Sequence, residues 1–469
     1  RRVGAHRDQQ PDRGNRVTAL YYALGVVLFV VAILVSIGLH EIGHMVPAKK
    51  FGGKVTQYFI GFGPTVWSKQ VGETEYGVKA IPLGGYVKIV GMLPPGADQL
   101  ADEITVDEAG NTVTRVRKSN TGMFTQLISD ARAAEWELIR PEDNDRLFYK
   151  LASWKKIVVM AGGPTVNILI AFFIFWGVFA TYGQKSVEAE TGAPVLETVS
   201  ECVLPYAEEG RACTAEDPRT PAVEAGLLPG DVITTFNGTP VTDWDQLREL
   251  IRGNEDGEAV IGYQRDGQQL TGTTNTTVEA RPTSATDETL RQVGFLGVTP
   301  TTRIVTETGG PIYTIDQMGD MTVETVKALG TLPVKVFDVA QAIVGLEERD
   351  PEGPVSIVGG GRLAGETVSH ETFPVTEKAV FLLMLIGGFN FFIGMFNFIP
   401  LLPLDGGHIA SAAWEGLRRR IARLRRRPDP GYVDAAKLLP IAYVVASVML
   451  VMGLVLIVGD LVVPLHLAG

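Results

Sequence analysis

Charged residues are scarce in this chain: they make up 20% of its 469 residues, whereas 45% are hydrophobic. This balance excludes an ordinary soluble enzyme of several domains. The sequence also lacks a basic stripe interleaved with aromatic residues, which excludes a nucleic-acid-binding protein. No small-residue cleavage site follows the first apolar run, so we expect that run to be a retained membrane segment rather than a secretory signal.

Four stretches lack any charged residue for long enough to cross a bilayer, namely 19–39, 157–183, 379–404 and 438–459. They predict a multi-pass α-helical membrane protein with four transmembrane helices. The densest basic cluster, at 418–427, predicts that the loop between the third and fourth spans is cytoplasmic. By parity, residues 184–378 lie outside the cell membrane. The basic N-terminal tail, residues 1–18, disagrees with this orientation because it favours a cytoplasmic N-terminus.

Only two cysteines occur, Cys202 and Cys213. Both fall in the segment that we place outside, where disulfides persist. We therefore predict a bridge between them. The alternative is two free thiols.

A metal-ligand pattern, His40-Glu41-Ile42-Gly43-His44, follows directly on the first apolar run. Residues four apart share one face of a helix, so His40 and His44 can direct both imidazoles at one metal ion, while Glu41 serves a water molecule beside it. The alternative is a chance match in which the histidines only cap or pack a helix. Ionisable groups at the end of a membrane span are costly unless they are functional, which favours the metal site.

A catalytic zinc site usually has three protein ligands, so the two histidines need a partner from elsewhere in the chain. Asp405 lies where the third span is expected to end, and parity places it at the same, cytoplasmic, end of the bilayer as the histidines. Pro400 and Pro403 interrupt the helix before it, so the chain can bend and present the carboxylate. His408 is a weaker alternative ligand, and Asp405 could instead be an interfacial residue at a helix end.

Two regions outside the spans have recognisable patterns. Aromatic residues and glycine turns between 54 and 92 predict short strands in a membrane-associated β-hairpin region. Its unpaired edge, within 76–89, could accept an extended substrate by strand addition, or the hairpin could merely cover the site. Residues 221–277 resemble a single α+β PDZ domain of the bacterial type, with an Asn-Gly hairpin and a helix for which Thr242 and Asp245 suit a capping box. This domain could bind a peptide or act only as a steric cap.

The remaining segments follow from composition. Residues 93–144 are polar and acidic, and we expect most of them to form a mobile cytoplasmic insertion; Gly330 and Pro333 are expected to break an amphipathic helix pair. The expected segments are an N-terminal tail at 1–18, a first span at 19–48, the hairpin region at 49–92, the insertion at 93–152, a second span at 153–183, the extracytoplasmic PDZ domain at 184–312, an amphipathic helical region at 313–378, a third span at 379–405, a basic cytoplasmic loop at 406–437 and a fourth span at 438–465.

Together these motifs resemble the site-2 protease family of intramembrane zinc metalloproteases, in the bacterial single-PDZ branch that cleaves anti-sigma factors. The resemblance covers nearly the whole chain and includes a Gly-Pro-Asn element at 163–167. The insertion and the basic tail depart from the family pattern. The resemblance implies Zn²⁺ as the cofactor, with these roles: His40, His44 and Asp405 as metal ligands, Glu41 as the catalytic residue and Asn397 as a substrate contact. We expect Gly85 and Tyr86 of the hairpin to contact the substrate as well.

The expected function is hydrolysis of a peptide bond within the transmembrane segment of a single-span membrane protein, after its outer portion has been trimmed. The partners are then such substrates and the lipid bilayer of the bacterial plasma membrane. Two alternatives remain open. A catalytically inert PDZ receptor would need neither Glu41 nor Asp405. A zinc transporter would need metal ligands spaced along a route across the membrane, whereas here they gather at one end.

Overall fold

The computed structural model describes residues 13–94, 105–106, 112–113, 128, 130–132, 139–208, 211–282 and 289–466. The chain divides into two compact units. Unit 1 comprises residues up to Tyr182 and from Gly309 onward, and unit 2 comprises Gly183–Thr308. Most of the expected insertion lies outside the described residues. Its described parts include the paired strands β3 (Thr105–Val106) and β4 (Thr112–Val113) and the short 3₁₀ helices η1 (Pro141–Arg146) and η2 (Phe148–Lys150).

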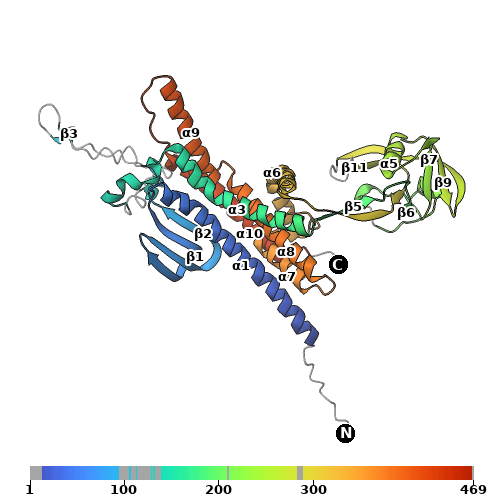
Figure 1. The fold of residues 1–469 in the computed structure, drawn as a ribbon, viewed down its shortest axis with the longest axis horizontal. Coiled ribbons are helices and arrows are strands. Elements are labelled where there is room, and N and C mark those ends of the chain that lie inside the picture. Colours follow the sequence, from blue (N-terminus) through green and yellow to red (C-terminus); the bar gives the residue numbers. More distant parts are fainter. Residues whose placement is uncertain are drawn as a thin grey trace, which may run out of the picture. The chain divides into compact units, whose positions relative to one another are not determined.

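Four helices within the described part of unit 1 are long and apolar enough to cross a membrane. They are α1 (Arg13–Lys50), α3 (Ser153–Thr181), α8 (Val375–Asn397) and α10 (Leu439–Val462) (Figure 1). Most of their surface remains exposed within the protein, because apolar side chains that face lipid need no protein cover. The chain is therefore a membrane protein.

The helices α1 and α3 touch through their backbones. A Cβ atom added to Gly43 would lie 2.4 Å from the carbonyl oxygen of Gly162, and one added to Gly162 would lie 2.0 Å from that of Gly43. Small residues permit such close approach in membranes, where packing rather than water drives association. Farther along, α3 packs against α8, where Gly387 meets Phe175 and Gly394 meets Ile168.

A sheet made by β1 (Val55–Val71) and β2 (Thr74–Ile89) lies beside α1 (Figure 1). Residues 57–60 of β1 pair with two parts of β2. The segment 85–88 lies on one side of them and the segment 75–78 on the other. Both strands fold back on themselves, with Gly61 and Gly84 in the left-handed region at the bends (φ +92° and +111°). The expected hairpin is therefore a sheet of four segments in the order 85–89, 55–60, 75–79 and 65–71.

One expectation about unit 1 is wrong. The pair of amphipathic helices expected to break near Gly330 and Pro333 is instead one helix, α6 (Pro311–Ile343), followed by a separate helix α7 (Ile357–Ser369). Packing of Val339 against α10 holds α6 together beyond the proline. The connection at 406–437 between the third and fourth candidate spans contains helices, with α9 at Asp405–Leu424 and the short η4 at Ala435–Leu438. Arginine and alanine are good helix formers, and this propensity prevails there.

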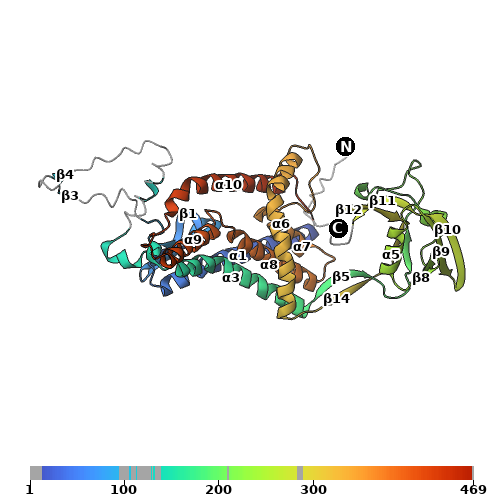
Figure 2. The same ribbon diagram turned by 90° about the horizontal axis from the view of Figure 1, so that it is seen from above.

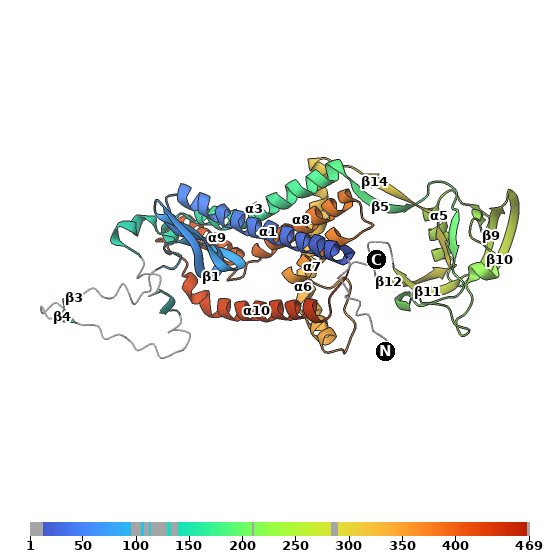
Figure 3. The ribbon, with the colours of Figure 1, turned by 90° about the horizontal axis from the view of Figure 1, so that it is seen from below.

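The helix α6 crosses the long helices rather than running along them, and α10 lies at the edge of the bundle (Figures 2 and 3). Contacts of α6 with α3, α8 and α10 fix this crossing. α7 packs against α1, where Gly25 approaches the carbonyl oxygen of Ala364.

Unit 2 is an α+β unit. Its core includes the fully buried Phe236, Leu247 and Ile261. The central sheet has the order β10-β9-β7-β8, and three further strand pairs are β5 with β14, β6 with β13 and β11 with β12. Its elements are β5 (Gln184–Ala189), β6 (Leu196–Val199), η3 (Tyr206–Glu208), α4 (Pro221–Glu224), β7 (Val232–Phe236), β8 (Thr239–Pro240), α5 (Trp244–Gly253), β9 (Glu258–Arg265), β10 (Gln268–Asn275), β11 (Thr277–Pro282), β12 (Leu290–Phe295), β13 (Val298–Pro300) and β14 (Thr302–Glu307).

Local features of unit 2 follow the sequence closely, with one exception. Asn237 and Gly238 have positive φ in the turn between β7 and β8, and Cys202 and Cys213 form a disulfide. The N-cap of α5 is Asp243, whose carboxylate accepts a hydrogen bond from the Gln246 backbone amide, so the expected capping box was misplaced by one residue. Asp243 competes better for this position because its side chain is ionised.

Candidate metal centre

The helix α1 places His40 and His44 on one face, one turn apart. His44 is buried and His40 is partly buried. The Nδ1–H of His44 donates to the carbonyl oxygen of Val159 on α3, at 2.8 Å. This bond fixes the ring orientation and leaves Nε2 free to bind a metal ion, as is usual for ligating histidines.

Asp405 reaches the histidines from a different helix. The helix α8 ends at Asn397, eight residues before Asp405, so the third span is shorter than expected. An irregular stretch containing Pro400 and Pro403 follows, and Asp405 is the first residue of α9. Proline cannot continue a helix, so the chain turns here and begins a new one whose first turn carries the carboxylate.

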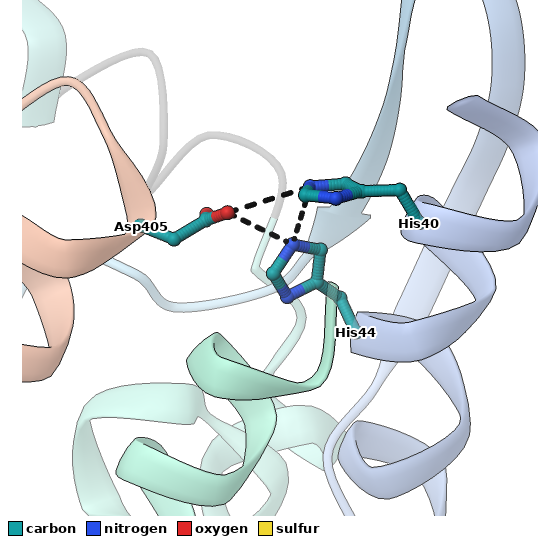
Figure 4. A group of neighbouring side chains, drawn as sticks. All are labelled: His40, His44 and Asp405. Atoms are coloured by element: carbon teal, nitrogen blue, oxygen red, sulfur yellow. Dashed lines mark hydrogen bonds and ion pairs between the residues drawn. The ribbon is translucent and has the colours of Figure 1, made fainter. Parts of the chain in front are cut away.

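The three side chains converge in a small triangle (Figure 4). His40 Nε2 lies 3.2 Å from His44 Nε2, and Asp405 Oδ2 lies 3.4 Å from His40 Nε2 and 3.3 Å from His44 Nε2. Two ligands of a tetrahedral zinc ion with bonds of ~2.0 Å are ~3.3 Å apart. Two imidazole nitrogens and one carboxylate oxygen are also the donor types that zinc prefers. The residues therefore fit a zinc ion without rearrangement.

The helix α3 leaves room for this triangle only because it carries glycine at 163. A Cβ atom there would lie 2.2 Å from His44 Nε2 and 2.7 Å from His40 Nε2. The Gly-Pro-Asn element at 163–167 thus forms one wall of the metal centre.

All the residues expected to form the site line one cavity of about 410 Å³. The expected site residues in its lining are His40, Glu41, His44, Gly85, Tyr86, Asn397 and Asp405. His408 also lines the cavity, but among the described residues the group with metal-binding geometry comprises only His40, His44 and Asp405. The cavity therefore joins the histidine helix, the sheet and the end of α8.

Glu41 and Asn397 occupy different walls of the cavity. Glu41 packs against the sheet, where a Cβ atom on Gly85 would lie 3.2 Å from Glu41 Cγ. Asn397 donates its Nδ2–H to the carbonyl oxygen of Ile393, one turn back on α8. Tyr86 stacks on Phe59, with ring centroids 5.7 Å apart.

Sequence reasoning missed the ion pair that holds α9 in place. Lys156 Nζ lies 2.9 Å from both carboxylate oxygens of Glu415, and both side chains are buried. The pair joins α3 to α9 three turns beyond Asp405, so it helps to set the position of that helix. No sequence signal indicates this pair, because Lys156 and Glu415 are 259 residues apart in the chain.

Comparison with known proteins agrees with this geometry. The model of peptidase family M50 matches residues 28–430. Zinc metalloprotease Rip1 of Mycobacterium tuberculosis is 33% identical over 462 residues, and that of Mycolicibacterium smegmatis is 35% identical over 458; each match covers 96% of this chain and 100% of the relative. A putative zinc metalloprotease of Rhizobium meliloti is 25% identical over 408 residues, covering 86% of this chain and 89% of the relative. The chain therefore belongs to peptidase family M50, the site-2 protease family, and is a zinc metalloprotease.

Proposed function

We propose that this protease hydrolyses a peptide bond within the transmembrane segment of single-span membrane proteins, such as anti-sigma factors, after their outer portion has been trimmed. One observation carries the proposal: the His40, His44 and Asp405 triangle lies at the ends of candidate membrane spans and opens into a cavity. A peptide bond must come to membrane depth to reach it.

The proposed roles follow from position. His40, His44 and Asp405 hold the zinc ion, which when bound polarises the scissile carbonyl and acidifies water. The Glu41 carboxylate takes a proton from the attacking water and returns it to the leaving amine. Its place beside His40, with its side chain against the sheet, supports this role.

The outer sheet segment, 85–89, is the proposed platform for the substrate. Among the described strands it pairs on one side only, and it borders the cavity at Gly85 and Tyr86. A helix hides its peptide groups in internal hydrogen bonds, so a substrate must be extended to be cut. Strand addition to this edge would supply the main-chain bonds that the substrate loses. Asn397, which lines the same cavity, would hold the substrate through its side-chain amide.

Unit 2 is the proposed PDZ domain and lies outside the cell. In the proposed topology, unit 1 crosses the membrane four times and holds the metal centre near the cytoplasmic side. Its α+β topology and a groove of about 360 Å³ between α5 and β12 support this assignment. The seven arginines at 418–427 support the orientation. In this arrangement unit 2 excludes substrates with bulky outer domains.

The test compares the wild type with Glu41→Gln and Asp405→Ala, purified in the same way. Zinc is measured by elemental analysis, and activity by cleavage of a single-span reporter. We expect both variants to lose activity. Only Asp405→Ala loses zinc, because Glu41 is not a ligand.

Two results would contradict the proposal. Reporter cleavage that survives Glu41→Gln would show that Glu41 is not the proton carrier, or that a contaminating enzyme is at work. Zinc transport by the wild type in proteoliposomes, without reporter cleavage, would favour the transporter alternative.

A further inference from the structure

A second cavity in unit 1 is larger than that of the metal centre and lies between α9 and the start of α10. Its volume is about 720 Å³. Its walls are the irregular stretch after α8, one face of α9 and the first turns of η4 and α10. The lining residues include Leu401, Trp414, Arg418, Lys437, Leu438 and Ile441. None of these residues lines the metal centre.

The lining is amphipathic. Leu401, Leu438 and Ile441 are apolar and 39%, 36% and 55% exposed, which is a large exposure for three neighbouring aliphatic side chains. Arg418 and Lys437 supply two cations to the same crevice. Trp414, 55% exposed, also borders it, and tryptophan is typical of the boundary between lipid and water.

The two cations lack counter-ions in the part of the chain that the structure describes. Arg418 donates to the carbonyl oxygen of Pro430 at 2.7 Å, a neutral partner, and Lys437 forms no ion pair there. The acidic residue of the lining, Asp434, is paired with Arg132. The crevice therefore has two positive charges that its own carboxylate does not neutralise.

The crevice also lies between the ends of two candidate membrane spans. The candidate span α8 stops at Asn397 and the next candidate span begins at Ala435, on either side of the crevice. α10 packs against α6 and α7, and within the described residues only Ala442, Gly459 and Asp460 of this helix are buried. Most of α10 is therefore open to lipid, and Figure 3 shows it along the edge of the bundle.

We propose that this crevice binds an anionic phospholipid. The phosphate lies between Arg418 and Lys437, and the acyl chains follow Leu401, Leu438 and Ile441. Basic pockets between membrane helices bind lipid headgroups in this way. The proposal does not depend on which substrate the protease cleaves.

Lipid binding here bears on the metal centre through the chain itself. Leu401 precedes Asp405 and Ala410 follows it, and both line the crevice. A bound lipid therefore stabilises the bend that presents the Asp405 carboxylate. We expect anionic lipid to slow the loss of zinc to a chelator.

The experiment uses the full chain in nanodiscs of phosphatidylcholine, with or without phosphatidylglycerol. The test variant is Arg418→Gln with Lys437→Gln. The control is Arg420→Gln with Arg423→Gln, which removes the same charge from residues that do not line the crevice. Photoactivatable phosphatidylglycerol and native mass spectrometry measure bound lipid, and chelator-driven zinc loss gives a second readout.

We expect the test variant to retain about tenfold less anionic lipid than the wild type and to lose zinc at a rate that phosphatidylglycerol no longer slows. The control should behave as the wild type. Equal losses in both variants would mean general surface attraction and would overturn the proposal. A further test replaces Trp414 by a photoreactive residue. Crosslinking of this residue to the reporter substrate rather than to lipid would also overturn the proposal.

Arg418→Gln also removes the bond to Pro430 and so could disturb folding. Two milder variants therefore test the same site. Arg418→Lys keeps the positive charge and should retain lipid, and the single variant Lys437→Gln should bind lipid about threefold more weakly. If Lys437→Gln has unchanged lipid binding, the crevice is not the headgroup site.

Discussion

Gly163 controls the space beside both histidines of the metal centre. It faces both imidazoles from α3, and even a methyl group there would lie 2.2 Å from His44 Nε2. α1 and α3 also pack closely through their backbones at Gly43 and Gly162, and moving the helices apart would break this packing. A side chain at 163 therefore either displaces the imidazoles or costs the packing of the two helices.

Gly163→Ala should lower zinc affinity by about 10–100-fold, the usual effect of disturbing the surroundings of a metal ligand. Competition with a chelator of known affinity measures the change. Gly177→Ala is the matched control, because it lies on the same helix with open space around it. A Gly163→Ala protein with unchanged zinc affinity would contradict the assigned packing.

At the scale of elements, Gly85 lets the outer sheet segment lie close to α1 and to the neighbouring strand. A Cβ atom on Gly85 would lie 3.0 Å from Ile37 Cγ2, 3.0 Å from the carbonyl oxygen of Phe59 and 3.2 Å from Glu41 Cγ. The sheet edge at Gly85 and the side chain of Glu41, the proposed proton carrier, thus lie next to each other. A larger residue at 85 would push them apart without touching the metal ligands.

Gly85→Val should therefore lower reporter cleavage by about tenfold, the effect of a modest overpacking strain, while zinc content stays unchanged. Gln70→Val, on the exposed far segment of the sheet, should leave both unchanged. Rates are measured with the single-span reporter at fixed zinc occupancy. Loss of zinc in Gly85→Val would assign this glycine to the support of the metal centre instead.

Elements that depend on local sequence were predicted, and those that depend on distant partners were not. The apolar runs and the His-Glu-His spacing define α1 and its face, and two prolines before Asp405 indicate the bend that brings it to the histidines. The sheet of four segments was missed because Gly61 and Gly84 look like ordinary turns until each strand is seen to pair twice. The junction of α3 with α9 was missed because Lys156 and Glu415 are 259 residues apart.

At the scale of the whole molecule, unit 2 is inserted into unit 1 through two adjacent strands. Gln184, at the start of β5, pairs with Glu307, at the end of β14. The chain therefore leaves unit 1 and returns to it at almost the same place. A segment with adjacent ends can be removed without stretching the rest of the chain.

Replacement of 184–307 by a two-residue glycine-serine linker should leave the metal centre intact, because all its residues belong to unit 1. If unit 2 excludes untrimmed substrates, the wild type will cleave only a trimmed reporter. The shortened protein will cleave the trimmed reporter and a reporter that keeps its outer domain equally fast. Initial rates on both reporters provide the measurement. Zinc content checks the fold, and Glu41→Gln in the shortened chain excludes a contaminant. A shortened protein that still requires trimming would show that selection resides in unit 1.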